Sequence, residues 1–138
     1  HVTVRARRTT VDYAHVLKEL ADIHFAKADK IDLVQDNLNT HRRASLYEAF
    51  PPAEAKRIAD RFDWHYTPKH GSWLNIAECE LSVLARQCLD RRIPDQAALE
   101  AQVIAWTQNR NNAQAKTRWH FTTEDARTKL ISLYPQID

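Results

Sequence analysis

The chain has 138 residues, of which 43% are hydrophobic, and a formal net charge of +2. This length suits one domain with its own core, so we expect residues 1–138 to form a single domain. A nearly balanced charge does not by itself mark a nucleic-acid binder, and such a case must come from local basic clusters. The single glycine excludes phosphate loops built on several glycines, so no nucleotide cofactor is expected.

No stretch of the sequence is apolar and long enough to span a bilayer, and the start lacks the apolar core of a signal peptide. We therefore expect a soluble, cytoplasmic protein without a membrane partner. Cys79 and Cys88 lie in one predicted helix, about 180° apart on its circumference, so they cannot bridge each other. Because methionine is absent even at position 1, we expect the chain to be a piece of a longer protein.

The first half of the chain predicts strands that alternate with helices. Alternating apolar residues indicate a half-exposed strand, and apolar residues at helical spacing indicate an amphipathic helix. The predicted segments are a strand over 2–6, a helix from about Val11 with Thr10 as candidate N-cap, a strand over 31–35 that ends at Asp36, helices on either side of Pro51 and Pro52, and a strand over 63–68.

The second half of the chain predicts helices alone. A long helix is expected over 73–89, another after Pro94, and a last one capped by Thr122 or Thr123. Strands alternating with helices are typical of the α/β class. We therefore expect a small mixed sheet flanked by helices, with a helical C-terminal half.

Glu78 occupies an unexpected position in the predicted helix over 73–89. At about 100° per residue it falls inside an apolar stripe, whereas Glu80 points elsewhere. The stripe consists of Leu74, Ala77, Leu81, Ala85, Cys88 and Leu89. An ionised carboxylate in such a stripe is costly unless it is paired, hydrogen-bonded or bound to a cation. We therefore expect Glu78 to face inward and to have a partner.

Asp36, at the end of the predicted strand from Ile31, is a second carboxylate whose position needs an explanation. Open α/β sheets bind ligands just outside the carboxyl ends of their strands, and carboxylate oxygens suit Mg²⁺ or Mn²⁺. Asp36 and Glu78 together could hold such a metal. The alternative stays open at this point: Asp36 is also ordinary turn chemistry, and Glu78 could favour the helix dipole or pair with Arg42, Arg43 or Lys69.

Two stretches, LVQDNLNTH and HYTPKHGSWLNIAECELSVL, carry a resemblance to a known family. They resemble the second and third acidic motifs of DDE transposases of the mariner-like insertion-sequence superfamily, and the resemblance spans essentially the whole chain. The matching positions are Asp36, Asn37 and His41 in the first motif, and Thr67, Pro68, Leu74, Asn75 and Glu78 in the second.

The resemblance implies part of a ribonuclease H-like fold and a transposase that cuts phosphodiester bonds at transposon ends, then transfers the freed 3′ hydroxyl to target DNA. It implies Mg²⁺ or Mn²⁺ as cofactor, with two cations stabilising an in-line displacement. Asp36 and Glu78 would be the catalytic metal ligands, surrounded by Asn37, Asn39, His41 and Asn75. The expected partner is double-stranded DNA, with a homodimer as one assembly and a bacterial, nucleoid-associated location.

Basic residues near the two motifs are expected to hold DNA phosphates. They are Lys69, His70, Arg42 and Arg43, and Arg5, Arg7 and Arg8 would extend the same track. The chain departs from the family in two ways: the first catalytic Asp is expected upstream of residue 1, and the interval from Asp36 to Glu78 is longer than usual. The alternative function is a catalytically inactive transposase remnant that binds DNA or protein.

Overall fold

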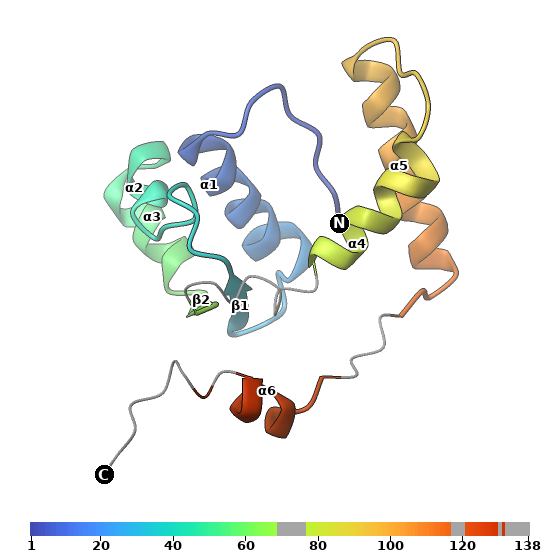
Figure 1. Ribbon diagram of the computed structural model, residues 1–138. Coiled ribbons are helices and arrows are strands. Elements are labelled where there is room, and N and C mark those ends of the chain that lie inside the picture. The colour runs from blue at the N-terminus through green and yellow to red at the C-terminus, as the bar shows by residue number, and fades with distance from the viewer. Residues whose placement is uncertain (69–76, 117–120, 130, 132–138) are drawn as a thin grey trace. The chain divides into compact units, whose positions relative to one another are not determined.

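The structure is a computed structural model, and it describes residues 1–68, 77–116, 121–129 and 131 (Figure 1). Its sheet, within these residues, consists of β1 (Ile31–Gln35) and β2 (Phe62–Tyr66), which pair in parallel with Gln35 opposite Tyr66. The chain divides into two compact units, residues 1–107 and 108–138, and each is described by itself. The first unit contains both strands.

One helical segment precedes β1, and two more connect β1 to β2. Helix α1 (Thr10–Glu19) is continued by the π-helical turn η1 (Leu20–His24), and the crossover between the strands contains α2 (Ser45–Ala49) and α3 (Pro52–Ala59). Figure 1 shows α1, α2 and α3 grouped beside β1 and β2. Parallel strands need such a crossover, because their carboxyl ends lie at the same edge of the sheet.

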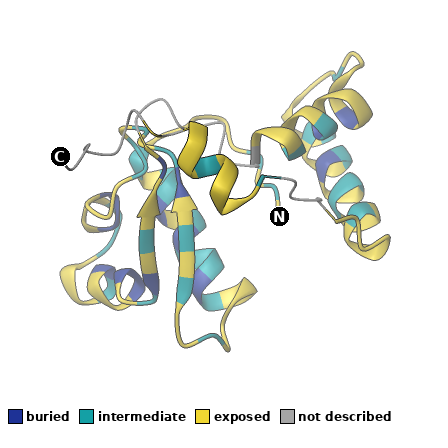
Figure 2. Cartoon of the chain, turned by 60° about the horizontal axis from the view of Figure 1, so that its bottom comes forward, coloured by how far each residue is buried: buried dark blue, intermediate teal, exposed yellow. Residues whose placement is uncertain are grey.

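Each of these elements buries one face in the main core. The fully buried members are Ala14, Leu17, Ala21, Leu46, Ala55, Ile58, Ala59 and Phe62. On β1, Ile31 and Leu33 pack against this core while Val34 is 57% exposed, so burial alternates along the strand as Figure 2 shows. The amphipathic helices expected here are therefore confirmed, and the strand expected from Ile31 is present but exposes Val34.

A smaller core forms between α4 (Ala77–Leu84), the π-helical turn η3 (Ala85–Leu89) and α5 (Gln96–Asn112). Its buried members are Leu84, Cys88 and Val103. Cys79 is exposed and Cys88 is buried, and both are free, as expected from their spacing. The second unit contains α6 (Thr123–Lys129), which is capped by Thr122.

The predicted strand over 2–6 is wrong, because these residues form no regular secondary structure. Their alternation has another cause: Val2 and Val4 pack against the smaller core while Thr3 and Arg5 are exposed. The predicted cap of α1 is also one residue off. Thr9 is the N-cap, and its Oγ1 accepts a hydrogen bond from the Asp12 N–H at 3.1 Å, because the capping box needs an acid three residues further on.

The α/β class and the helical C-terminal half are confirmed. The sheet differs from the expected mixed one, since the described residues provide only two strands and these run parallel. None of the helices in the described part of the chain is both long and apolar enough to cross a membrane.

Candidate catalytic site

The candidate site begins where β1 and β2 end together. Asp36 directly follows β1 and Thr67 directly follows β2. The Thr67 N–H donates a hydrogen bond to the Gln35 carbonyl at 2.8 Å, and the Asn37 side-chain amide donates to the Thr67 carbonyl at 2.7 Å. These two contacts fasten the loop after β1 to the loop after β2, and they fix the backbone on either side of Asp36.

The Asp36 carboxylate is held through one of its two oxygens. Oδ1 accepts a hydrogen bond from the Leu38 N–H at 3.2 Å, and His41 Nδ1 lies 2.5 Å away. Because an ionised carboxylate only accepts, Nδ1 is the donor in this contact. No described residue donates to Oδ2, and the Asp36 side chain is 39% exposed. The second oxygen is therefore left for a cation or for solvent.

Tyr13 and Gln35 hold His41 in place. The Tyr13 hydroxyl donates to Gln35 Oε1, Gln35 Nε2 donates to the His41 carbonyl at 3.1 Å, and the Tyr13 and His41 ring centroids are 4.8 Å apart. Burial raises the pKa of the Tyr13 hydroxyl above its usual value, so it remains a donor. Gln35 is only 5% exposed, so this network is a fixed part of the core.

The sequence interpretation missed Tyr13 and Gln35. A signal was present, because Gln35 continues the inward-facing series of Ile31 and Leu33 along β1. A polar side chain at an inward strand position needs a hydrogen-bond partner. That partner proves to be Tyr13, on a helix 22 residues earlier in the chain.

Glu78 lies in the first turn of α4 and is exposed, so the expectation that it faces inward within an apolar stripe is wrong. The stripe itself is displaced: Leu81 is 56% exposed, whereas Leu84 and Cys88 are buried. The predicted stripe assumed one 3.6-residue period from 73 to 89, whereas the π-helical turn over Ala85–Leu89 has a longer period, so residues of this turn do not continue the face that holds Glu78 and Leu81. An exposed carboxylate at this helix start needs no buried partner.

The other predicted site residues separate into four groups. Asn37 joins the two strand ends, as described above. Asn39 Oδ1 accepts a hydrogen bond from Arg42 Nη2 at 3.3 Å, so these two residues bind each other. Arg43 Nη2 lies 3.3 Å from Asp60 Oδ1 at the end of α3. The predicted Lys69, His70 and Asn75 fall outside the described residues.

The remaining acids near the start of the chain have other partners. Asp12 belongs to the cap of α1, where the hydrogen bond from the Thr9 side chain lowers its pKa. Asp22 is bound by Arg57 through two contacts of 2.9 Å, which lowers the pKa of Asp22 to about 2. Asp32 is on the exposed face of β1, 3.4 Å from His65. Each of these three acids thus lies against a neighbouring residue of its own.

Comparison with protein families decides the class of the chain. Residues 1–100 match the model of the DDE superfamily endonucleases, which is more than half of the chain. The chain belongs to this family. A search of curated proteins and a search of solved structures each found no match. The resemblance to this family is thereby confirmed, and the α/β architecture is consistent with part of a ribonuclease H-like fold.

Membership among the DDE endonucleases implies a DNA substrate and, in general, divalent metal ions. Asp36 fits such an ion, because it offers a half-exposed carboxylate oxygen at the carboxyl end of a parallel strand. A complete ligand set is a different matter: within the described residues, no group of three or more His, Cys, Asp or Glu side chains is placed to hold a metal. The carboxylate of Asp36 suits a hard cation, but the described residues do not identify the other ligands of that cation.

Proposed function

We propose that this DDE endonuclease domain takes part in metal-dependent cutting and joining of DNA, with Asp36 and Glu78 as its acidic metal ligands. Water attacks a phosphodiester at a transposon end, the bond from phosphorus to the 3′ oxygen breaks, and a free 3′ hydroxyl remains. That hydroxyl then attacks a phosphodiester of target DNA and displaces its leaving oxygen. Bound Mg²⁺ or Mn²⁺ would supply charge stabilisation for the attacking and leaving oxygens.

The observation that carries the proposal is the state of the Asp36 carboxylate. One of its oxygens is held by Leu38 and His41, and the other receives no hydrogen bond from the described residues. A carboxylate fixed in this way keeps its orientation when a cation binds, and such supporting contacts are typical of metal ligands. Glu78 is exposed in the first turn of α4 and has the same hard oxygen chemistry.

The chain's own residues have three further tasks in this proposal. Asn37 keeps the ends of β1 and β2 together through its contact with Thr67. Asn39 and Asn75 are proposed to approach the metal ligands when the ion binds, which for Asn39 requires release of its contact with Arg42. Arg42, Arg43, Lys69 and His70 neutralise phosphates of double-stranded DNA. The domain acts on DNA in the cytoplasm, at the bacterial nucleoid, with a homodimer as one assembly. That residues 1–138 form one domain stays a prediction.

A plasmid-nicking assay with Mg²⁺ or Mn²⁺ tests the proposed function. The chain is assayed as printed and, in parallel, extended upstream to the expected first acid. We expect nicking in the extended form, and a loss of at least about a hundredfold for Asp36→Asn and for Glu78→Gln, because each removes a charged metal ligand. Asp32→Asn on the same strand and Glu80→Gln on the same helix are the matched controls, and both retain nicking.

Nicking that survives both Asp36→Asn and Glu78→Gln would reject this assignment. If no form of the protein nicks DNA but the printed chain still binds it, the alternative of an inactive remnant that acts as a binding module replaces the proposal.

A further inference from the structure

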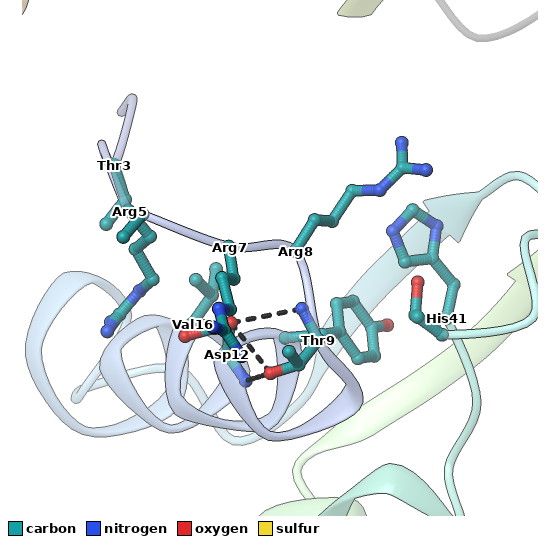
Figure 3. Close-up of a pocket in the computed structure, with 11 residues that line it drawn as sticks. Thr3, Arg5, Arg7, Arg8, Thr9, Asp12, Val16 and His41 are labelled. Atoms are coloured by element: carbon teal, nitrogen blue, oxygen red, sulfur yellow. Dashed lines mark hydrogen bonds between the residues drawn. The ribbon is translucent and has the colours of Figure 1, made fainter.

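A hollow of about 510 Å³ lies beside the candidate site, at the start of α1 (Figure 3). Its walls come from the segment before α1, the first turns of α1 and the loop after β1; they include Arg7, Arg8, Tyr13, Thr40 and His41. His41 is shared with the candidate site, since its Nδ1 contacts Asp36. A ligand in the hollow would therefore lie next to the residue that supports the proposed catalytic acid.

The hollow has a surplus of positive charge. Its acid, Asp12, is engaged in the cap of α1 with Thr9, and one of its arginines, Arg5, is paired with Glu19 at 3.0 Å. Arg7 and Arg8 are exposed, and neither forms a hydrogen bond or ion pair with any residue that the structure describes. Two guanidinium groups are thus free, and their planar donors match the oxygens of a phosphate.

A second hollow of about 490 Å³ shows which end of this surface attracts anions. It shares Arg5 and Arg7 with the first hollow but is also bordered by Glu100 of α5. Of these two hollows, Arg8 borders the one that contains His41. In Figure 3, Arg8 extends on the same side of the hollow as His41. The end with Arg8 therefore combines free positive charge with proximity to Asp36, whereas the end with Glu100 repels anions.

We propose that the hollow lined by Arg8, Arg7 and His41 binds phosphodiesters of the DNA strand that enters the catalytic site. This inference rests on the proposed function, because DNA enters there only if Asp36 acts on it. More than one phosphate fits better than a single anion, because the two free guanidinium groups belong to successive residues, Arg7 and Arg8, while Arg5 is paired with Glu19. The Cα atoms of successive residues are about 3.8 Å apart, and each strand of a duplex carries one phosphate per about 3.4 Å of helix axis.

Fluorescence anisotropy without divalent metal tests this subsite, because binding is then read independently of cleavage. Two labelled duplexes of unrelated sequence are titrated with the printed chain over a series of chloride concentrations. We expect Arg8→Ala to bind both duplexes several-fold more weakly and to lower the slope of log K against log salt by about 1, as the loss of one phosphate contact predicts. The control Arg92→Ala, an exposed arginine outside the hollow, keeps the slope of the wild type.

An unchanged slope in Arg8→Ala would overturn the inference. Thermal melting of Arg8→Ala is measured alongside, and we expect the melting temperature of the wild type because the side chain is exposed and forms no hydrogen bond or ion pair with a described residue. Inorganic phosphate replaces chloride at equal ionic strength in a further titration. Because free phosphate competes for the guanidinium groups that would bind the DNA, we expect it to displace DNA from the wild type beyond the effect of chloride, and less so from Arg8→Ala. Equal displacement from both proteins would overturn the inference.

The two proposals fail separately in these experiments. A protein that never nicks DNA but shows the Arg8-dependent slope refutes the catalytic proposal and keeps the subsite as a DNA-binding surface. A protein that nicks through Asp36 with a slope independent of Arg8 refutes the subsite alone.

Discussion

Asp36 is oriented by its neighbours before any cation arrives. Its Oδ1 receives the Leu38 N–H and lies 2.5 Å from His41 Nδ1, and His41 is held in turn by Gln35 through its carbonyl and by the ring of Tyr13. A ligand held in this way loses little freedom when it binds metal, and removal of such support typically costs 10- to 100-fold in metal affinity.

We therefore predict that His41→Asn weakens binding of Mn²⁺ by about 10- to 100-fold. Isothermal titration calorimetry measures the affinity. His65→Asn is the matched control, because His65 also faces an aspartate, Asp32, on the paired strand, yet at 3.4 Å and on the exposed face. Equal affinities for His41→Asn and the wild type would show that the contact with Asp36 does not support the metal ligand.

At the scale of elements, charged side chains fasten the end of α1 and η1 to α3. Arg57 binds Asp22 through two contacts of 2.9 Å and Glu54 through one of 2.7 Å, and Lys18 contacts both acids. The hydrogen bonds from Arg57 lower the pKa of Asp22 and of Glu54 to about 2. A network of four charges with a bidentate arginine stabilises a fold more than an isolated surface ion pair does.

The sign of the pH dependence follows from these lowered values. A carboxylate whose pKa is lower in the folded state stabilises the fold above its unfolded pKa of about 4, and this contribution is lost as the pH falls towards 2. We predict that Arg57→Ala lowers the melting temperature by roughly 2–5 °C at neutral pH, and that the difference from the wild type shrinks below about pH 4.

Differential scanning calorimetry at several pH values checks this prediction, with Arg86→Ala on η3 as an exposed control. A melting difference that stayed constant from neutral pH down to pH 2 would show that Arg57 acts through packing rather than through the two acids.

Most elements were predictable because their signals are local. Neighbouring residues determine the periodicity of α1, the proline at the start of α3 and the cap of α6 by Thr122. They also indicate β1 and β2, the second of which was expected over 63–68 and is found at Phe62–Tyr66. The failures had non-local causes. Residues 2–6 alternate because Val2 and Val4 contact helices far along the chain, and the stripe of α4 shifted because a π-helical turn follows it.

For the molecule as a whole, the family was predictable from the sequence, but the contacts that make Asp36 a candidate ligand were not. Asp36 was found by its place after a strand, and that place is confirmed. The contacts with Tyr13 and Gln35 were missed, because they join segments that lie apart in the chain and meet only once α1 packs beside β1. Glu78 was assigned to an inward face that the structure does not give it.

In the proposed site, Asp36 and Glu78 share one divalent cation. Paramagnetic broadening by Mn²⁺ in a ¹⁵N-resolved NMR spectrum of the chain shows whether both residues lie near the same ion. We predict that substoichiometric Mn²⁺ broadens the amide signals of Asp36, Asn37 and Glu78 together, and that Asp36→Asn abolishes the broadening at Glu78 as well as at its own segment. Broadening near Asp36 that leaves the start of α4 untouched, or broadening at Glu78 that survives Asp36→Asn, would contradict a shared site.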